Sequence, residues 1–184
     1  MEGPSSRRSQ ILDVAARLFA ERGFHGVSVG DIGKAMGVSG PALYKHFDSK
    51  DAVLAEMLVA ISERLLAEGR DRVAGADGPD AAIAGLVDWH VEFALGQPSL
   101  IVVQDRDWQS LPTEARERVR SLQREYVDLW ADQLRLRDPT LALDRARAMA
   151  HAAFGLINST PHSSLLPGAA MHDLLVQMAM RSLS

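Results

Sequence analysis

Cysteine is absent from this chain of 184 residues. Disulfide bonds and zinc–thiolate sites are therefore excluded, and the absence fits a reducing compartment. Long apolar runs are also missing, since no stretch approaches the roughly 20 residues of a membrane span. Residues 1–10 lack the apolar core of a signal peptide. We therefore expect a soluble protein of the cytoplasm with no membrane partner.

Aromatic residues are scarce, at 5% of the chain, and no histidine pair has the H-E-x-x-H spacing. We therefore expect no metal site and no cofactor. The net charge of -4 argues at first against a polyanionic partner. Up to Lys50, however, seven basic residues outnumber five acidic ones, which gives +2 and leaves -6 for the rest. A mildly basic N-terminal part is compatible with binding DNA phosphates.

The strongest local pattern lies between Val27 and Asp51. A short helix ends at Gly37, which can adopt the positive φ of a tight turn. A second helix can begin at once, because Ser39 can cap its first turn and Pro41 falls where no amide partner is lost. Its apolar side would face inward, with small and basic residues outward. Two such helices are typical of a helix-turn-helix reader of the major groove.

Several spaced motifs mark the same stretch: Val29-x-Asp31-Ile32-Gly33, Val38-Ser39, Leu43-Tyr44, His46-Phe47 and Ser49-Lys50. Together they resemble the DNA-binding domain of the TetR family of bacterial repressors, over about the first quarter of the chain. The resemblance implies an all-α fold with a three-helix helix-turn-helix DNA-binding domain over residues 1–50. It also implies that residues 51–184 form a helical domain for effector binding and dimerisation.

The predicted DNA contacts are of two kinds. Tyr44, His46 and Lys50 would bind phosphates; the alternatives are a packed aromatic ring, an exposed imidazole and a solvated lysine. Base reading would fall to the second helix, where only Lys45 can donate to guanine acceptors, so DNA shape would share the specificity. The predicted DNA-binding set is Ser28, Ser39, Gly40, Pro41, Ala42, Tyr44, Lys45, His46 and Lys50.

The run Gly26-Val27-Ser28-Val29-Gly30 matches the G-x-S-x-G elbow of serine hydrolases. That elbow works where a buried strand delivers the serine into a sharp turn, whereas an amphipathic helix precedes it here. Ser28 stands three residues before Asp31, close to the spacing of a capping box. We therefore predict a helix cap at Ser28 and no catalytic residue. In the resembling family this hydroxyl or its amide commonly meets a DNA phosphate.

The rest of the chain shows helical periodicity and no alternating strand pattern. Helices are predicted over about residues 9–22, 49–73, 80–95, 99–108, 113–136, 140–159 and 168–183. In the resembling family, the helix over 49–73 is the lever through which an effector changes the spacing of two DNA-binding domains.

Two groups of side chains in the C-terminal part bear on function. Large rings often line small-molecule pockets, and small side chains let helices approach closely; ordinary core is the alternative for both groups. The predicted effector pocket comprises Trp89, His90, Phe93, Trp108, Tyr126, Trp130, Met149 and Phe154. The dimer interface that the resemblance implies comprises Ala146, Ala150, Ala153, Ile157, Met171, Leu174, Leu175 and Met178.

Arg116, Arg120 and Arg124 form a stripe at i, i+4 spacing. It could hold a phosphate-bearing ligand such as an acyl-CoA, although pairs such as Glu117 with Arg120 favour a solvated face. The sequence thus predicts a dimeric repressor, released from a palindromic DNA operator by a small-molecule effector, and not an enzyme. The alternative is a helical enzyme or ligand carrier. Effector identity, operator sequence, regulated genes and the choice between repression and activation stay open.

Overall fold

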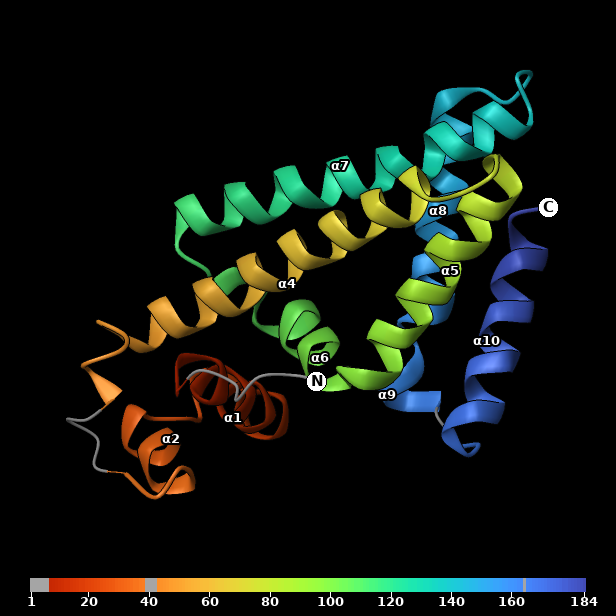
Figure 1. Cartoon of the computed structure of the whole chain (residues 1–184). Helices are drawn as coiled ribbons and strands as arrows, with labels where there is room; N and C mark the ends of the chain where they lie inside the picture. Colours follow the sequence, from red (N-terminus) through yellow and green to blue (C-terminus); the bar gives the residue numbers. More distant parts are fainter. Residues whose placement is uncertain (1–6, 39–42, 164) are drawn as a thin grey trace. The chain divides into compact units, whose positions relative to one another are not determined.

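The computed structural model describes residues 7–38, 43–163 and 165–184. These residues form helices and no strand, which confirms the all-α prediction (Figure 1). Within them no helix is both long and apolar enough to cross a membrane. In chain order the elements are α1 (Arg7–Arg22), α2 (Val29–Ala35), α4 (Lys50–Ala74), α5 (Pro79–Gly96), α6 (Pro98–Asp107), η1 (Trp108–Ser110), α7 (Thr113–Arg137), α8 (Leu143–Ile157), α9 (Thr160–Ser163) and α10 (Gly168–Ser182).

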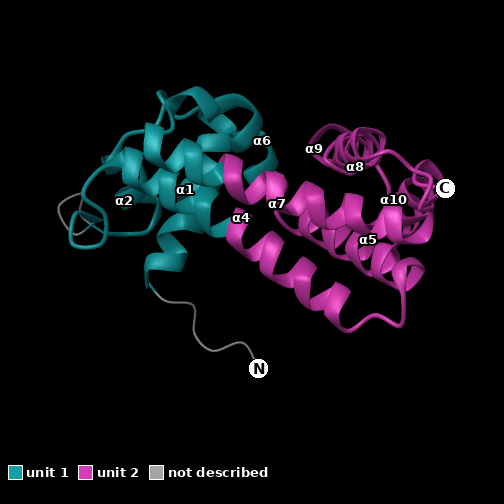
Figure 2. Ribbon diagram, turned by 90° about the horizontal axis from the view of Figure 1, so that it is seen from above, with its two compact units in different colours: residues 1–61, 99–119 teal, residues 62–98, 120–184 magenta. Residues whose placement is uncertain are grey.

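The chain divides into two compact units (Figure 2). Unit 1 comprises residues 1–61 and 99–119, and unit 2 comprises residues 62–98 and 120–184. The division passes through α4 and α7 and gives α6 to unit 1, whereas the predicted boundary follows residue 50. The boundary between the functional domains stays a prediction.

The core of unit 1 is built on one side of α1. Ile11, Ala15 and Phe19 recur four residues apart and are at most 1% exposed, because this spacing places them on one helix face. Burial of such apolar side chains is the main stabilising contribution, at about 1.5–3 kcal/mol for each large one. The core also contains Ile32, Leu43, Phe47, Val53, Leu54, Leu58, Val103 and Leu111.

Two glycines end helices of unit 1 at the predicted positions. Gly23 follows α1 with a φ of +79°, and Gly37 follows α2 with a φ of +68°. Side chains with a Cβ rarely adopt these angles. After α2, the amide of Val38 donates to the carbonyl of Gly33 at 2.9 Å and closes the helix end. The predicted turn of the helix-turn-helix is confirmed.

In unit 2, α5, α8 and α10 pack against one another. The part of α4 that belongs to this unit approaches α7 closely at Gly69, where a Cβ atom would lie 2.8 Å from the ring of Tyr126. Only glycine permits this approach. The α5 side chains that recur at helical spacing are all buried, namely Ile83, Leu86, Val87, His90 and Phe93.

Helix ends near α8 differ from the prediction. α8 begins at Leu143 and not at residue 140, because the carboxylate of Asp138 accepts from the amide and hydroxyl of Thr140 at 3.0 and 2.7 Å. These bonds form a turn that competes with the helix. After α8, the short α9 contains Pro161, where we expected the helix only to end. Proline is tolerated in a first helical turn because its missing amide hydrogen has no partner to lose.

Candidate nucleic-acid interface and effector site

Ser28 caps the N-terminus of α2. The amide of Asp31 donates to the Ser28 hydroxyl oxygen at 3.1 Å, and the Asp31 carboxylate accepts from the Ser28 amide at 2.8 Å. This reciprocal pair is a capping box, which confirms the predicted cap. The bond from the Ser28 hydroxyl is the main cause that lowers the pKa of Asp31. A phosphate contact by Ser28 stays a prediction.

The structure describes part of the segment that we predicted to read DNA. Leu43 and Phe47 are buried, as predicted, whereas Tyr44 is 55% exposed and Lys45 is also exposed. A hydroxyl and an ammonium group on this edge are therefore accessible to an anionic partner. Outside the described residues lie Ser39, Gly40, Pro41 and Ala42.

Lys50, at the first position of α4, turns its side chain into unit 1. Its Nζ atom donates to the carbonyl of Phe24 at 2.7 Å and to that of Val27 at 2.8 Å. It also lies 4.2 Å from the centroid of the Phe24 ring. Two charge-assisted hydrogen bonds and a cation–π contact occupy the ammonium that we predicted to meet phosphate. Instead, this group ties the turn before α2 to the start of α4.

Arg8 of α1 contacts both α4 and the segment that contains His46 and Phe47. Its guanidinium pairs with the Glu56 carboxylate of α4, with Nε 2.5 Å from Oε1, and donates to the carbonyl of His46. It also lies 4.1 Å from the centroid of the Phe47 ring. The imidazole of His46 is half-buried, and its contact with phosphate stays a prediction.

A third cation, Arg106 of α6, binds the C-terminal end of α1. It donates to the carbonyl of Ala20 at 3.1 Å and to that of Phe19, and it pairs with buried Asp107 at 3.2 Å. A cation at this end of a helix is favoured by the helix dipole. No local pattern in the sequence predicts this contact, because Arg106 and Ala20 are 86 residues apart.

Unit 2 holds an aromatic cluster of His90, Phe93, Tyr126, Trp130 and Phe154. The His90 imidazole stacks on Phe154 and Tyr126, with ring centroids 4.7 and 5.7 Å apart, and lies 5.8 Å from Phe93. The Trp130 ring meets Phe154 edge-on at 4.9 Å. Residues of the predicted effector pocket thus come together from α5, α7 and α8.

Burial shifts the pKa values of His90 and Tyr126 in the aromatic cluster. It lowers the pKa of His90 to about 4, although a contact with Asn158 at 3.2 Å acts in the opposite direction. His90 is therefore neutral at pH 7. Burial also raises the pKa of Tyr126. The indole nitrogen of Trp130 is buried and forms no hydrogen bond of normal geometry with the described residues, although the Tyr126 side chain interacts with it. A ligand acceptor could also satisfy it.

Three predicted pocket residues lie outside the aromatic cluster. Trp108 packs on the core of unit 1. Trp89 donates to the carbonyl of Leu65 at 3.3 Å, because adjacent helical residues point about 100° apart and Trp89 leaves the side that His90 occupies. Met149 lines a different cavity, beside Arg145.

Arg116 departs from the predicted arginine stripe. Its guanidinium donates to the carbonyls of Gln109 and Leu111 at 3.0 and 2.7 Å. It therefore holds the loop before α7. Among the residues described, no group of three or more His, Asp or Glu side chains is placed to hold a metal ion.

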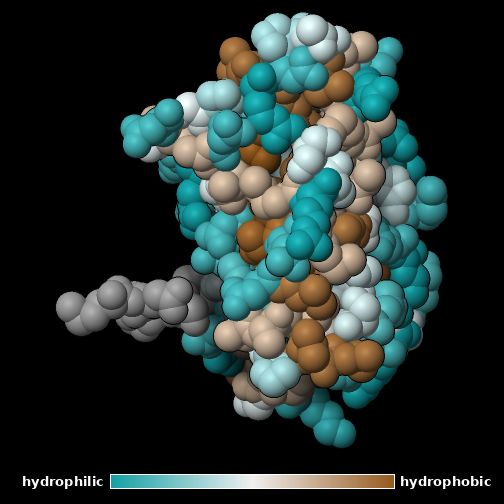
Figure 3. All heavy atoms as spheres, turned by 90° about the vertical axis from the view of Figure 1, so that its right-hand side faces the viewer, coloured by the Kyte–Doolittle hydropathy of each residue, from teal (hydrophilic) through white to brown (hydrophobic). Residues whose placement is uncertain are grey.

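Most side chains of the predicted dimer interface are buried within one chain. The exposed exceptions are Leu174 and Met178 of α10, at 38% and 44%. Figure 3 faces the side on which α10 lies and shows apolar side chains gathered along it. The other six side chains are at most 5% exposed and pack inside unit 2, as expected for ordinary core, the alternative to a dimer interface. They are Ala146, Ala150, Ala153, Ile157, Met171 and Leu175.

Known protein families match both parts of the chain. Residues 11–57 match the bacterial regulatory proteins of the tetR family, and residues 76–162 match the tetracyclin repressor-like C-terminal domain. Together with the helix-turn-helix geometry of unit 1, these matches define a bacterial regulatory protein. The chain belongs to the TetR family.

Individual relatives agree with this family. The HTH-type transcriptional repressor KstR2 of Rhodococcus jostii is 34% identical over 129 residues, which cover 70% of this chain and 63% of that protein, less than two thirds of its length. A TetR-family regulator from Bordetella parapertussis has a TM-score of 0.83 at 29% identity, over 96% of this chain and 95% of the other. FadR from Bacillus subtilis, solved in complex with stearoyl-CoA, has a TM-score of 0.74 at 17% identity, over 96% and 99% of the chains, which shows the fold alone.

Proposed function

We propose that the chain is a ligand-responsive transcriptional repressor that binds palindromic operator DNA as a homodimer. One observation carries the proposal: Tyr44 and Lys45 are exposed in the helix-turn-helix region, where Lys50 binds the carbonyls of Phe24 and Val27 and Arg8 binds that of His46. KstR2 of R. jostii, to which this chain is similar, is an HTH-type transcriptional repressor. A bacterial DNA-binding protein would act in the cytoplasm, where operator DNA lies, and would need no catalytic group.

Each protomer would place the second helix of its helix-turn-helix in a major groove. The Tyr44 hydroxyl would bind a phosphate, and Lys45 would read or approach a base edge. Because the ammonium of Lys50 is engaged by two carbonyl groups, its main-chain amide at the start of α4 would be the phosphate donor at that position.

The homodimer would form through the outer side of α8 and α10. His172 of α10 contacts Asp88 of α5 at 3.1 Å. Leu174 and Met178 stand about 200° and 240° further around the helix, so they point away from α5. On α8, Ala152 is exposed and small enough for close helix approach. A four-helix contact with the partner's α8 and α10 would cover the exposed apolar side chains of α10.

The effector would bind in unit 2 beside the aromatic cluster, where the buried Trp130 N–H could donate to it. Because FadR of B. subtilis was solved with stearoyl-CoA, a coenzyme A thioester is the candidate class for this chain. The effector would favour one position of α4, the helix that belongs to both units. A change in α4 would alter the spacing of the two DNA-binding units and release the operator.

Fluorescence anisotropy with duplex DNA from the region flanking the protein's own gene tests this proposal. We expect tight binding to one palindromic duplex, weaker binding to a scrambled duplex, and loss of affinity for both as salt rises. Catalytic turnover or ligand binding without salt-dependent affinity for any duplex would support the enzyme or carrier alternative.

A further inference from the structure

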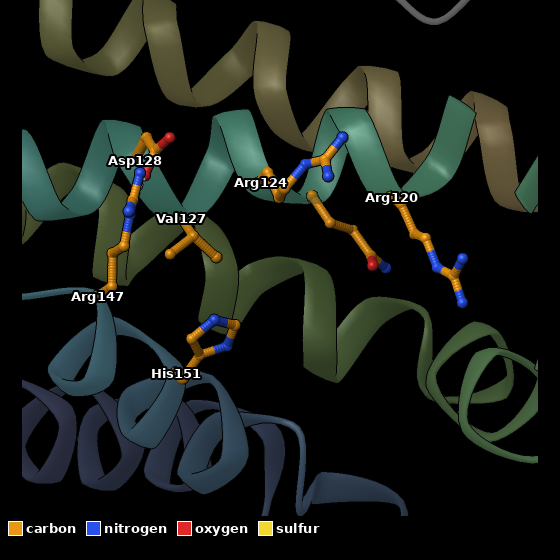
Figure 4. Close-up of a pocket in the computed structure, with 7 residues that line it drawn as sticks. Arg120, Arg124, Val127, Asp128, Arg147 and His151 are labelled. Atoms are coloured by element: carbon orange, nitrogen blue, oxygen red, sulfur yellow. Dashed lines mark hydrogen bonds and ion pairs between the residues drawn. The ribbon is translucent and has the colours of Figure 1, made fainter. Parts of the chain in front are cut away.

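A groove of about 420 Å³ lies between α7 and α8 within unit 2. Figure 4 shows Arg147 reaching from α8 to Asp128 on α7, and His151 of α8 lying near Val127, with Arg120 and Arg124 further along α7. The volume is in the range of small-molecule sites. Three arginines minus one aspartate give the groove a charge of +2, although the whole chain carries -4. The groove is thus a local site of attraction for anions.

The carboxylates around this groove do not neutralise Arg124. Its chain neighbour Glu125 pairs instead with Arg70 of α4 at 2.9 Å. Asp128, four residues further on the same helix, binds Arg147 at 2.6 Å. Arg124 is exposed and forms no ion pair within the described ranges. Its planar guanidinium can bind phosphate oxygens through two parallel hydrogen bonds.

The inner wall of the groove adjoins the aromatic cluster. His151 in the wall lies 6.2 Å, between ring centroids, from Phe154, which stacks on Tyr126 at 5.5 Å. Val127 in the same wall directly follows Tyr126 and is 7% exposed. The groove thus has charged side chains at one part of its wall and, at Val127 and His151, a part that packs against the buried aromatic cluster.

We propose that this groove binds the phosphate groups of a nucleotide thioester, with the acyl chain directed toward the aromatic cluster. The inference rests on the proposed function, because it assigns the head-group site of the effector. Arg124 is the principal phosphate ligand. Arg147 joins it when the incoming phosphate displaces the Asp128 carboxylate.

Isothermal titration calorimetry with octanoyl-CoA, coenzyme A, octanoate and inorganic phosphate tests the groove on the full chain. Arg124→Ala should weaken octanoyl-CoA binding about tenfold or more, the loss of a charge-assisted bidentate contact. Asp128→Asn should strengthen it, because Arg147 is then free for the ligand. The matched control is Arg118→Ala, which removes the same charge from α7 outside the groove and should leave the affinity unchanged. Melting temperatures check that each variant folds.

Several results would overturn the inference. The first is that the wild type does not bind octanoyl-CoA. The second is that Arg124→Ala and Arg118→Ala lose the same affinity for octanoyl-CoA. The third is that Asp128→Asn binds octanoyl-CoA more weakly than the wild type. If inorganic phosphate bound as tightly as coenzyme A, the groove would be a site for free phosphate. A nucleotide thioester would then no longer be its ligand. Operator anisotropy without any ligand tests the proposed function separately, since groove binding can persist when operator binding fails, and the reverse.

Discussion

The ammonium of Lys50 lies 2.7 Å from the carbonyl oxygen of Phe24 and 4.2 Å from the centroid of the ring of the same residue. A single lysine at the start of α4 thus binds both the main chain and the side chain of the turn before α2. The arrangement fixes the first helix of the helix-turn-helix against α4 inside unit 1. We therefore infer that Lys50 positions the turn before α2, since its charge is directed into unit 1.

Replacement of Lys50 by alanine should therefore destabilise the protein. Loss of two hydrogen bonds from a charged donor, which leaves two carbonyls partly unpaired, should cost about 2–4 kcal/mol. Urea unfolding followed by circular dichroism measures this change. Lys45→Ala is the control, because Lys45 is exposed, and should change the stability by less than about 0.5 kcal/mol. If Lys50→Ala left the stability unchanged and weakened DNA binding, the ammonium of Lys50 would instead contact a DNA phosphate directly.

Tyr44→Phe removes only the exposed hydroxyl that we assign to a phosphate. Affinity should fall about tenfold for operator and scrambled duplexes alike, because a hydrogen bond to a charged group is lost and no base contact changes. Anisotropy titrations with both duplexes give the two affinities. A changed base preference at unchanged affinity would contradict the assigned role.

Leu174→Asp should convert the dimer to monomers, because it places a charge in the apolar contact between α10 helices. Sedimentation velocity at several protein concentrations reports the assembly. Leu136→Asp provides the control, since this leucine of α7 is 65% exposed and lies outside the proposed contact. Equal dimer populations in the two variants would move the interface elsewhere.

Stability should depend on pH through His90. The pKa of an unfolded histidine is about 6.5, whereas burial lowers that of folded His90 to about 4. Below pH 6.5 the unfolded state therefore binds a proton that the folded state does not. The free energy of unfolding should fall as the pH drops from 6.5 to 4, by at most about 3 kcal/mol.

Chemical denaturation at a series of pH values measures this dependence. His90→Gln should flatten the curve between pH 4 and 6.5, because the titrating group is gone. His162→Gln is the control, since His162 is exposed, and should retain the slope of the wild type. The same slope in His90→Gln would show that other groups cause it.

Local features followed the sequence closely. The turns at Gly23 and Gly37 were predictable because a positive φ is a property of one residue. The capping box of Ser28 and Asp31 was predictable because its partners are three residues apart. Helix periodicity predicted α1, α4 and α5 to within a few residues for the same reason: each depends on spacing within one segment.

Contacts between distant segments did not follow. Lys50 was predicted to bind phosphate, yet its ammonium binds the carbonyl of Phe24, 26 residues earlier. Arg8 likewise binds a distant carbonyl, that of His46. On α8 and α10, periodicity identified an apolar stripe but could not say what covers it. A stripe looks the same whether its own chain or a second copy buries it.

The sequence by itself determined the helices, their glycine and capped ends, and the helix-turn-helix pattern, since these depend on conformational preferences over a few neighbouring residues. Only the tertiary structure decided which cations turn inward, which rings meet in the aromatic cluster, and where three arginines line a groove. Packing sets those outcomes, because it brings together side chains whose separation along the chain carries no periodic signal.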